Sequence, residues 1–347
     1  MTNEPLDRYL VQRYSQWQRR DLLRPMTSNE IIDTSIRIYQ SLGWTMLKLT
    51  AIPTLFTFGG LVFLMEIVIP MFSVTKTPDN ITNQVGEALF VTFVGLTLAI
   101  PIMMIGISSA SGVIVQLVAD RMMGSVPDPS AALAAAKKTF RKLFLLNVFE
   151  TIVGWSGVIL SGIFLMFSAM MDTTSMEGEV ASGVVAGVGM MGFMFGFLIL
   201  AFVVARHALT PAIVVLEGLP AMQAAKRSVK LMAANGKQMS GYWSVFSLFG
   251  IIPFLLLLIS PAIAMGLSFV DLEGQIGAIT SIPYAGSIVT KLIAFSPTFL
   301  AVWVLVPIWC TAITVLYFER RIRHEGLDIE VLARDVWKKS TKTRFEL

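Results

Sequence analysis

VASGVVAGVGMMGFMFGFLILAFVVA, residues 180–205, contains no charged side chain and ends against Arg206 and His207. A transmembrane helix needs about 20 consecutive apolar residues, so this stretch is long enough to cross a bilayer. Five other stretches are similarly apolar and long: 49–72, 88–118, 143–171, 243–270 and 288–318. The sequence therefore predicts an all-α polytopic membrane protein, with six transmembrane helices arranged as three hairpins.

The same opening stretch is rich in small residues. Its glycines form two pairs with the GxxxG spacing: Gly183 with Gly187, and Gly192 with Gly196. In lipid such pairs let helix backbones approach closely. We predict that these four glycines form a helix-packing face, either inside the bundle or in a dimer.

Lysine and arginine are distributed unequally among the segments that connect the spans. Of the 27 basic residues, 25 lie in the N-terminal arm, the second and fourth connections and the tail. Only Lys76 and Lys291 lie on the opposite side. Cytoplasmic segments of membrane proteins carry the excess of basic residues, so we predict that both termini are cytoplasmic. The first residues are polar and arginine-rich, which is not the pattern of a cleavable signal peptide.

The composition argues against a soluble domain. The 347 residues are 55% hydrophobic and 14% charged, whereas soluble domains carry about 25% charged residues. The basic balance does not indicate nucleic acid as a partner, because the basic residues flank the predicted spans. There they favour one orientation and attract anionic lipid headgroups.

Each predicted hairpin is preceded by a segment with the pattern of a basic amphipathic helix in the membrane plane. Thr27 and Glu30 have the spacing of a capping box at the start of the first. Asp128 is a candidate N-cap for the second, with Pro129 at the first helical position. Gly218 can end the helix before the third. We therefore expect three in-plane cytoplasmic helices, one before each hairpin.

An internal repeat is a further prediction. Residues 132–141 align without a gap with residues 221–230, and most of the paired positions are identical or similar in character. Three like-oriented units would be related by an axis along the membrane normal. The alternative is that basic amphipathic helices before spans resemble one another through shared physical demands.

The chain divides into three parts by composition. Residues 1–23 are predicted as a cytoplasmic amphipathic extension, which either anchors in the headgroup layer or docks a partner. Residues 24–328 form the membrane domain, and residues 329–347 a cytoplasmic basic tail.

Ionisable residues inside predicted spans are the candidates for function. Glu150 lies inside the third span near its cytoplasmic end, and Arg206 and His207 close the fourth span on the same side. We expect Glu150 to pair with Arg206. The group would be either an ion pair that fixes helix register, or a site for a lipid headgroup or a proton.

No segment carries a signature of catalysis. The two histidines, His207 and His324, have no neighbours at clear metal-ligand spacing, and neither a phosphate-binding glycine loop nor a nucleophile elbow is found. We therefore predict no catalytic residue, cofactor or metal. The run Arg321–Asp328 is interpreted as the basic end of the last helix, capped by Gly326.

Three short motifs resemble a known family: LRP at 23–25, PAIVVLEG at 211–218 and LYFE at 316–319. Their order and placement are similar to the prokaryotic six-span proteins labelled "glycerophosphoryl diester phosphodiesterase membrane domain". The resemblance covers about residues 22–335 and implies a prokaryotic cytoplasmic (inner) membrane location. It does not imply the activity in the label, which belongs to a separate barrel of about 250 residues that we do not find here.

These observations favour a non-enzymatic scaffold or accessory subunit that organises partner proteins or lipids at the cytoplasmic leaflet. The expected partners are anionic lipids and a membrane protein or a second copy of the chain, and not nucleic acid. The alternative is a transporter or lipid-moving permease with a site near Glu150 and Arg206. An intramembrane lipid hydrolase has the least support.

Overall fold

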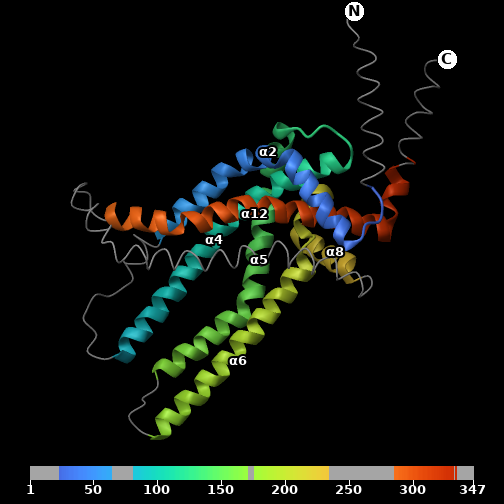
Figure 1. Ribbon diagram of the computed structural model, residues 1–347. Coiled ribbons are helices and arrows are strands. Elements are labelled where there is room, and N and C mark those ends of the chain that lie inside the picture. The colour runs from blue at the N-terminus through green and yellow to red at the C-terminus, as the bar shows by residue number, and fades with distance from the viewer. Residues whose placement is uncertain (1–22, 65–80, 171–175, 234–284, 332, 334–347) are drawn as a thin grey trace, which may run out of the picture.

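A computed structural model describes residues 23–64, 81–170, 176–233, 285–331 and 333. These residues contain helices and no strands, which confirms the all-α prediction for the part described. The helices are α2 (Ser28–Phe63), α4 (Ile81–Met122), α5 (Pro129–Met170), α6 (Met176–His207), α7 (Thr210–Leu216), α8 (Ala221–Ala233) and α12 (Ala285–Glu325) (Figure 1).

Four helical segments are long and apolar enough to cross a membrane: Ser28–Phe63, Pro101–Met122, Val180–Leu216 and Trp303–Glu325. By length and composition the chain is therefore a membrane protein. The predicted span at 243–270 lies outside the described residues, as do residues 1–22 of the extension and nearly all of the tail. The six-span count, the three hairpins and the orientation stay predictions.

The start of α2 confirms the predicted capping box. The Thr27 amide donates to Glu30 Oε2 at 2.7 Å, and the Glu30 amide donates to Thr27 Oγ1 at 3.4 Å. Each side chain thus satisfies a backbone donor that has no partner within the helix. The helix then continues through Gly43 and Pro53 to Phe63 without a break.

The start of α5 confirms Asp128 as its N-terminal cap. Asp128 Oδ1 accepts from the Ser130 amide at 2.9 Å, and the Asp128 carbonyl accepts from the Ala132 amide at 3.0 Å. However, α5 is one helix from Pro129 to Met170. The expectation of a separate in-plane helix before this span is therefore wrong. Residues 130–153 contain neither glycine nor proline, so nothing in the local sequence ends the helix where its basic part gives way to its apolar part.

Replacement of Asp128 by alanine should lower the melting temperature at neutral pH. Hydrogen bonds from the Ser130 side chain and amide hold the pKa of Asp128 below its usual range. A lowered folded-state pKa stabilises the fold above the usual pKa of about 3.9, and the benefit disappears as the pH falls through the lowered value. Thermal unfolding of wild type and Asp128→Ala from pH 7 downward should converge at acidic pH. Asp128→Asn keeps a side-chain oxygen that can accept from the Ser130 amide, so its melting temperature should differ less from wild type at neutral pH, and that difference should also shrink at acidic pH. A difference between wild type and Asp128→Ala that stays constant with pH would contradict the assignment.

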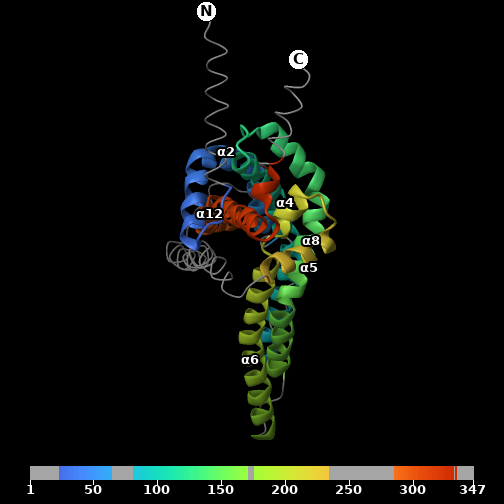
Figure 2. The same cartoon turned by 90° about the vertical axis from the view of Figure 1, so that its right-hand side faces the viewer.

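The buried core lies where all the described helices meet. It combines the N-terminal part of α2, the second half of α4, the first half of α5, the end of α6 at Ala205, α7, α8 and the second half of α12. Fully buried side chains come from each of these regions: Met46, Leu117, Leu143, Ala205, Ile213, Ala224 and Leu316. Figures 1 and 2 show the long helices leaving this junction in different directions, with α2 and α12 lying across the direction of α5 and α6. The described helices therefore do not form a parallel bundle.

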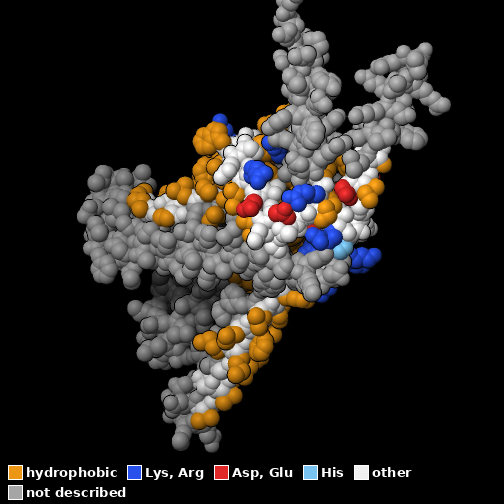
Figure 3. All heavy atoms as spheres, turned by 45° about the vertical axis from the view of Figure 1, so that its right-hand side comes forward, with side chains coloured by type: hydrophobic (Ala, Val, Ile, Leu, Met, Phe, Trp, Pro, Cys, Tyr) orange, Lys and Arg blue, Asp and Glu red, His pale blue; other side chains and the backbone are white. Residues whose placement is uncertain are grey.

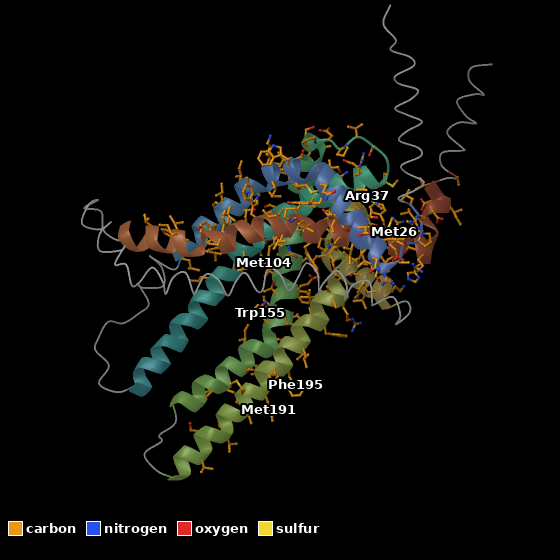
Figure 4. All side chains as sticks on the ribbon, viewed as in Figure 1. Met26, Arg37, Met104, Trp155, Met191 and Phe195 are labelled. Atoms are coloured by element: carbon orange, nitrogen blue, oxygen red, sulfur yellow. The ribbon has the colours of Figure 1, made fainter. Side chains whose placement is uncertain are left out.

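The paired helices α5 and α6 extend away from this core and lie side by side along their length (Figures 1 and 2). The outer surface of α6 is apolar and exposed, with Met191 at 68%, Phe195 at 62% and Leu198 at 65% exposure. Figure 4 places Met191 and Phe195 on the projecting part of α6, whereas Met26 lies at the start of α2 near the junction. An exposed apolar surface of this extent fits contact with lipid or another membrane protein.

Candidate functional site

A cluster of charged and hydroxyl side chains joins α7, α8 and α12 within the core. Arg227 on α8 lies between two carboxylates: its Nε contacts Glu217 Oε2, and its Nη2 lies 2.9 Å from Glu325 Oε1. Tyr317 Oη donates to Glu217 Oε1 at 2.9 Å, and Arg321 Nε donates to Glu325 Oε2 at 2.9 Å. Arg227 therefore connects the end of α7 to the end of α12.

The cluster continues toward α2 along the next turn of α12. Arg323 Nε donates to Glu319 Oε1 at 2.5 Å, and Arg323 Nη2 donates to the Met26 carbonyl at 3.0 Å. Glu319 is almost fully buried, at 3% exposure. We call these side chains the charge cluster: Glu217, Arg227, Tyr317, Glu319, Arg321, Arg323 and Glu325.

The surroundings of Arg227 favour its charged form. Burial by itself lowers the pKa of Arg227, but hydrogen bonds and the negative charges of Glu217 and Glu325 outweigh burial and raise that pKa. The guanidinium therefore stays charged, and its planar shape suits two carboxylates at once. Each carboxylate of the charge cluster lies against a guanidinium, so the cluster is suited to joining helices rather than to acid–base chemistry.

The charge cluster contains residues of two of the three short motifs found in the sequence, and it contacts the residue that follows the third. Glu217 belongs to the motif at 211–218, Tyr317 and Glu319 belong to the motif at 316–319, and Met26 directly follows the motif at 23–25. Sequence reasoning did not identify the cluster. It interpreted 321–328 as a basic helix end capped by Gly326, and that cap is confirmed by a φ of 63° at Gly326. The available signal was Glu217, which is the single acidic residue of the otherwise basic segment 206–237.

The predicted site at Glu150, Arg206 and His207 is only partly brought together. His207 Nδ1 lies 3.1 Å from Glu150 Oε1, within hydrogen-bond distance, and both side chains are about one-fifth exposed. Arg206 lies instead over the Phe202 ring, 5.2 Å from its centroid. The expected pair between Glu150 and Arg206 is not formed. Consecutive residues of an α-helix point about 100° apart, so only one of the two can face α5, and it is His207.

A second polar contact near Glu150 was not predicted. Asn147 Nδ2 donates to Ser108 Oγ at 2.8 Å, with both side chains buried between α5 and α4. Thr151 Oγ1 lies 3.4 Å from the sulfur of Met104 on the same interface. Buried polar contacts between helices fix their relative register, since a shift would leave the groups unpaired. Nothing in the sequence distinguishes Asn147 or Ser108 from ordinary polar residues near a span end.

A double-mutant cycle should separate the observed pair from the expected one. We expect Glu150→Gln and His207→Gln to couple by about 0.5–3 kcal/mol in the free energy of unfolding, as residues in contact do. Glu150→Gln and Arg206→Gln should be additive within about 0.5 kcal/mol. The measurement is unfolding in mixed micelles with increasing sodium dodecyl sulfate. Coupling of Glu150 to Arg206 alone would contradict the pairing described here.

The four predicted packing glycines divide into two groups. A Cβ on Gly192 would lie 2.7 Å from Ser161 Oγ, and a Cβ on Gly157 of α5 would lie 2.8 Å from the Gly196 Cα, so Gly192 and Gly196 face α5. A Cβ on Gly183 or Gly187 would have no atom within 4 Å. Gly192 and Gly196 thus pack against α5, whereas Gly183 and Gly187 have no described residue packed against them.

The described residues contain no group of three histidine, cysteine, aspartate or glutamate side chains placed to hold a metal ion. No family model matches the chain, and neither a curated protein nor a solved structure matches it.

Proposed function

We propose that the chain is a non-enzymatic integral membrane scaffold or accessory subunit, which organises partner proteins or lipids at the cytoplasmic leaflet of a prokaryotic inner membrane. One observation carries the proposal. A core with paired charges lies directly beside long helices whose apolar side chains are exposed. On the face drawn in Figure 3, basic and acidic side chains gather on one part of the surface, and hydrophobic side chains follow the projecting helices. The core is suited to contacts in the headgroup layer and cytoplasm, and the helices to contacts in the membrane.

The exposed basic residues support contact with anionic lipid. Lys137, Lys138 and Arg141 on α5 and Lys226 and Lys230 on α8 are all exposed. They belong to the second and fourth connections between the predicted spans, which the orientation prediction places in the cytoplasm. Each Lys or Arg near an anionic membrane surface contributes about 1 kcal/mol to the attraction. Lys142 is different, because its Nζ donates to the Gly218 carbonyl at 2.7 Å and joins α5 to the turn before α8.

The proposal is tested by extracting the full chain from its native membrane in polymer-bounded lipid discs and identifying the co-purifying proteins and lipids by mass spectrometry. We expect a reproducible protein partner and an enrichment of anionic lipids over the surrounding membrane. Lys226→Gln with Lys230→Gln should reduce the lipid enrichment, whereas Lys226→Arg with Lys230→Arg should preserve it. A chain that always purifies without a partner and without lipid enrichment would contradict the proposal.

A permease is the second candidate, and the pair Glu150–His207 is the observation that favours it. An ionisable pair inside a predicted span is a common feature of transport pathways. The measurement is movement of fluorescent lipid across proteoliposomes containing the full chain. In a permease, Glu150→Gln should abolish movement while the fold stays intact. In a scaffold, wild type should move no lipid, and Glu150→Gln should only weaken the packing of α5 on α6.

A further inference from the structure

A half-open cavity of about 300 Å³ lies beside the charge cluster, where the end of α4 meets α12 and the segment that follows α12. Its volume is at the lower end of the range for small-molecule sites, about 300–1,000 Å³. The polar part of its lining comes from Gln116, Asp120, Tyr317, Arg321 and Glu330.

Asp120 is a carboxylate without a cationic partner among the described residues. It accepts a hydrogen bond from Gln116 Nε2 at 2.9 Å and another from the Asp128 amide, and both donors are neutral. The guanidinium in the lining, Arg321, is already bound to Glu325 at 2.9 Å and lies 3.3 Å from Tyr317 Oη. Asp120 is therefore the carboxylate of this lining on which the negative charge is not balanced by a described cation.

The remaining walls are apolar and aromatic. Met123 on α4, Leu216 on α7 and Phe318 on α12 line the cavity together with the Tyr317 side chain. Aromatic faces attract cations, and the face of the Tyr317 ring already holds the Arg321 guanidinium, 5.8 Å from the ring centroid. Phe318 is therefore the aromatic side chain of this lining that is left for a ligand. The last turn of α4 also presents the negative end of its helix dipole near Asp120. The cavity therefore combines one unpaired carboxylate, an aromatic wall and an apolar wall.

We propose that this cavity binds a small organic ammonium cation with an apolar part, and that Asp120 pairs with its ammonium group. Two sources have this chemistry: a free amine, and the amine headgroup of a membrane lipid. The orientation prediction places this end of α4 at the cytoplasmic leaflet, where both sources are within reach. The site is separate from the scaffold function, which depends on the basic surface and the apolar helices.

The test uses the full chain in nanodiscs made only of phosphatidylglycerol, with butylammonium as the probe and calorimetry as the measurement. We expect saturable binding at millimolar concentrations, with no binding of butanol or butyrate. Asp120→Asn removes the charge while keeping the shape, and should weaken binding at least about tenfold, the equivalent of about 1.4 kcal/mol. The matched control Asp33→Asn removes the same charge from the exposed face of α2 and should leave binding unchanged.

A second variant keeps the proposal testable if Asp120→Asn does not fold. Met123→Trp fills the cavity without changing charge and should abolish binding. Nanodiscs that contain phosphatidylethanolamine distinguish the two sources: weaker apparent binding of butylammonium indicates that the lipid headgroup competes, and unchanged binding indicates a free amine. Absence of butylammonium binding to the wild type, equal binding by Asp120→Asn, or a preference for butyrate would overturn the proposal.

Discussion

Replacement of Arg227 by methionine should lower the free energy of unfolding by on the order of 2–3 kcal/mol. Removal of one partner from a fully buried ion pair costs about 3–5 kcal/mol, because the other charge is left buried and unpaired. Arg227 is 29% exposed, so water compensates for part of this loss. Two carboxylates, Glu217 and Glu325, lose their guanidinium at once, which makes this the most sensitive position of the charge cluster.

The neighbouring residue provides the matched control. Lys226→Gln removes one positive charge from the same turn of α8, but Lys226 is exposed, so the change should stay within about 0.5 kcal/mol. Arg227→Lys keeps the charge and should recover only part of the loss, because an ammonium does not bridge two carboxylates as a guanidinium does. Unfolding in mixed micelles is again the measurement. Equal losses for Arg227→Met and Lys226→Gln would mean that the charge cluster does not hold the core together.

The contrast between the caps and the charge cluster shows what the sequence could predict. The capping box of Thr27 and Glu30, the cap at Asp128 and the glycine at 326 are all local, since each depends on residues within a few positions of one another. The contacts of the charge cluster are not local. Arg227 and Glu325 are 98 positions apart. Many pairs of segments in the sequence carry opposite charges. Which of these charges lie in contact is determined by the folded arrangement of α7, α8 and α12.

The separate in-plane helix expected before the third span and the expected pair of Glu150 with Arg206 failed for different reasons. The change from basic to apolar composition near residue 143 was interpreted as the end of a helix. Composition changes which environment a helix meets, but it does not end the helix. Glycine and proline are the residues that most disfavour a helix interior, and residues 130–153 of α5 contain neither. For Glu150, the sequence offered two possible partners at consecutive positions, Arg206 and His207. Which of them faces α5 depends on the rotation of α6, which the uniformly apolar stretch before them does not determine.

The close approach of α5 and α6 leads to the second large effect, at Gly157. A Cβ at this position would lie 2.8 Å from the Gly196 Cα. The obstacle is backbone, so it cannot move aside as a flexible side chain would. Overpacking of this kind typically lowers the free energy of unfolding by about 1–3 kcal/mol. The loss should be larger for Gly157→Leu than for Gly157→Ala. Separation of the two helices should also appear as a loss of crosslinking between cysteines placed on α5 and α6 in a Cys310→Ala background.

Gly162 on the same helix is the control for this prediction. A Cβ there would have no neighbour within 4 Å, so Gly162→Ala should be neutral or stabilising, by up to about 1 kcal/mol from the better helix propensity of alanine. Gly183→Ala on α6 should behave in the same way, because that position is also open. The two GxxxG pairs would then differ in role: residues 192 and 196 hold α6 against α5, and residues 183 and 187 do not. If Gly183→Ala proved as damaging as Gly157→Ala, the first pair would have to pack against a surface that the described residues do not include.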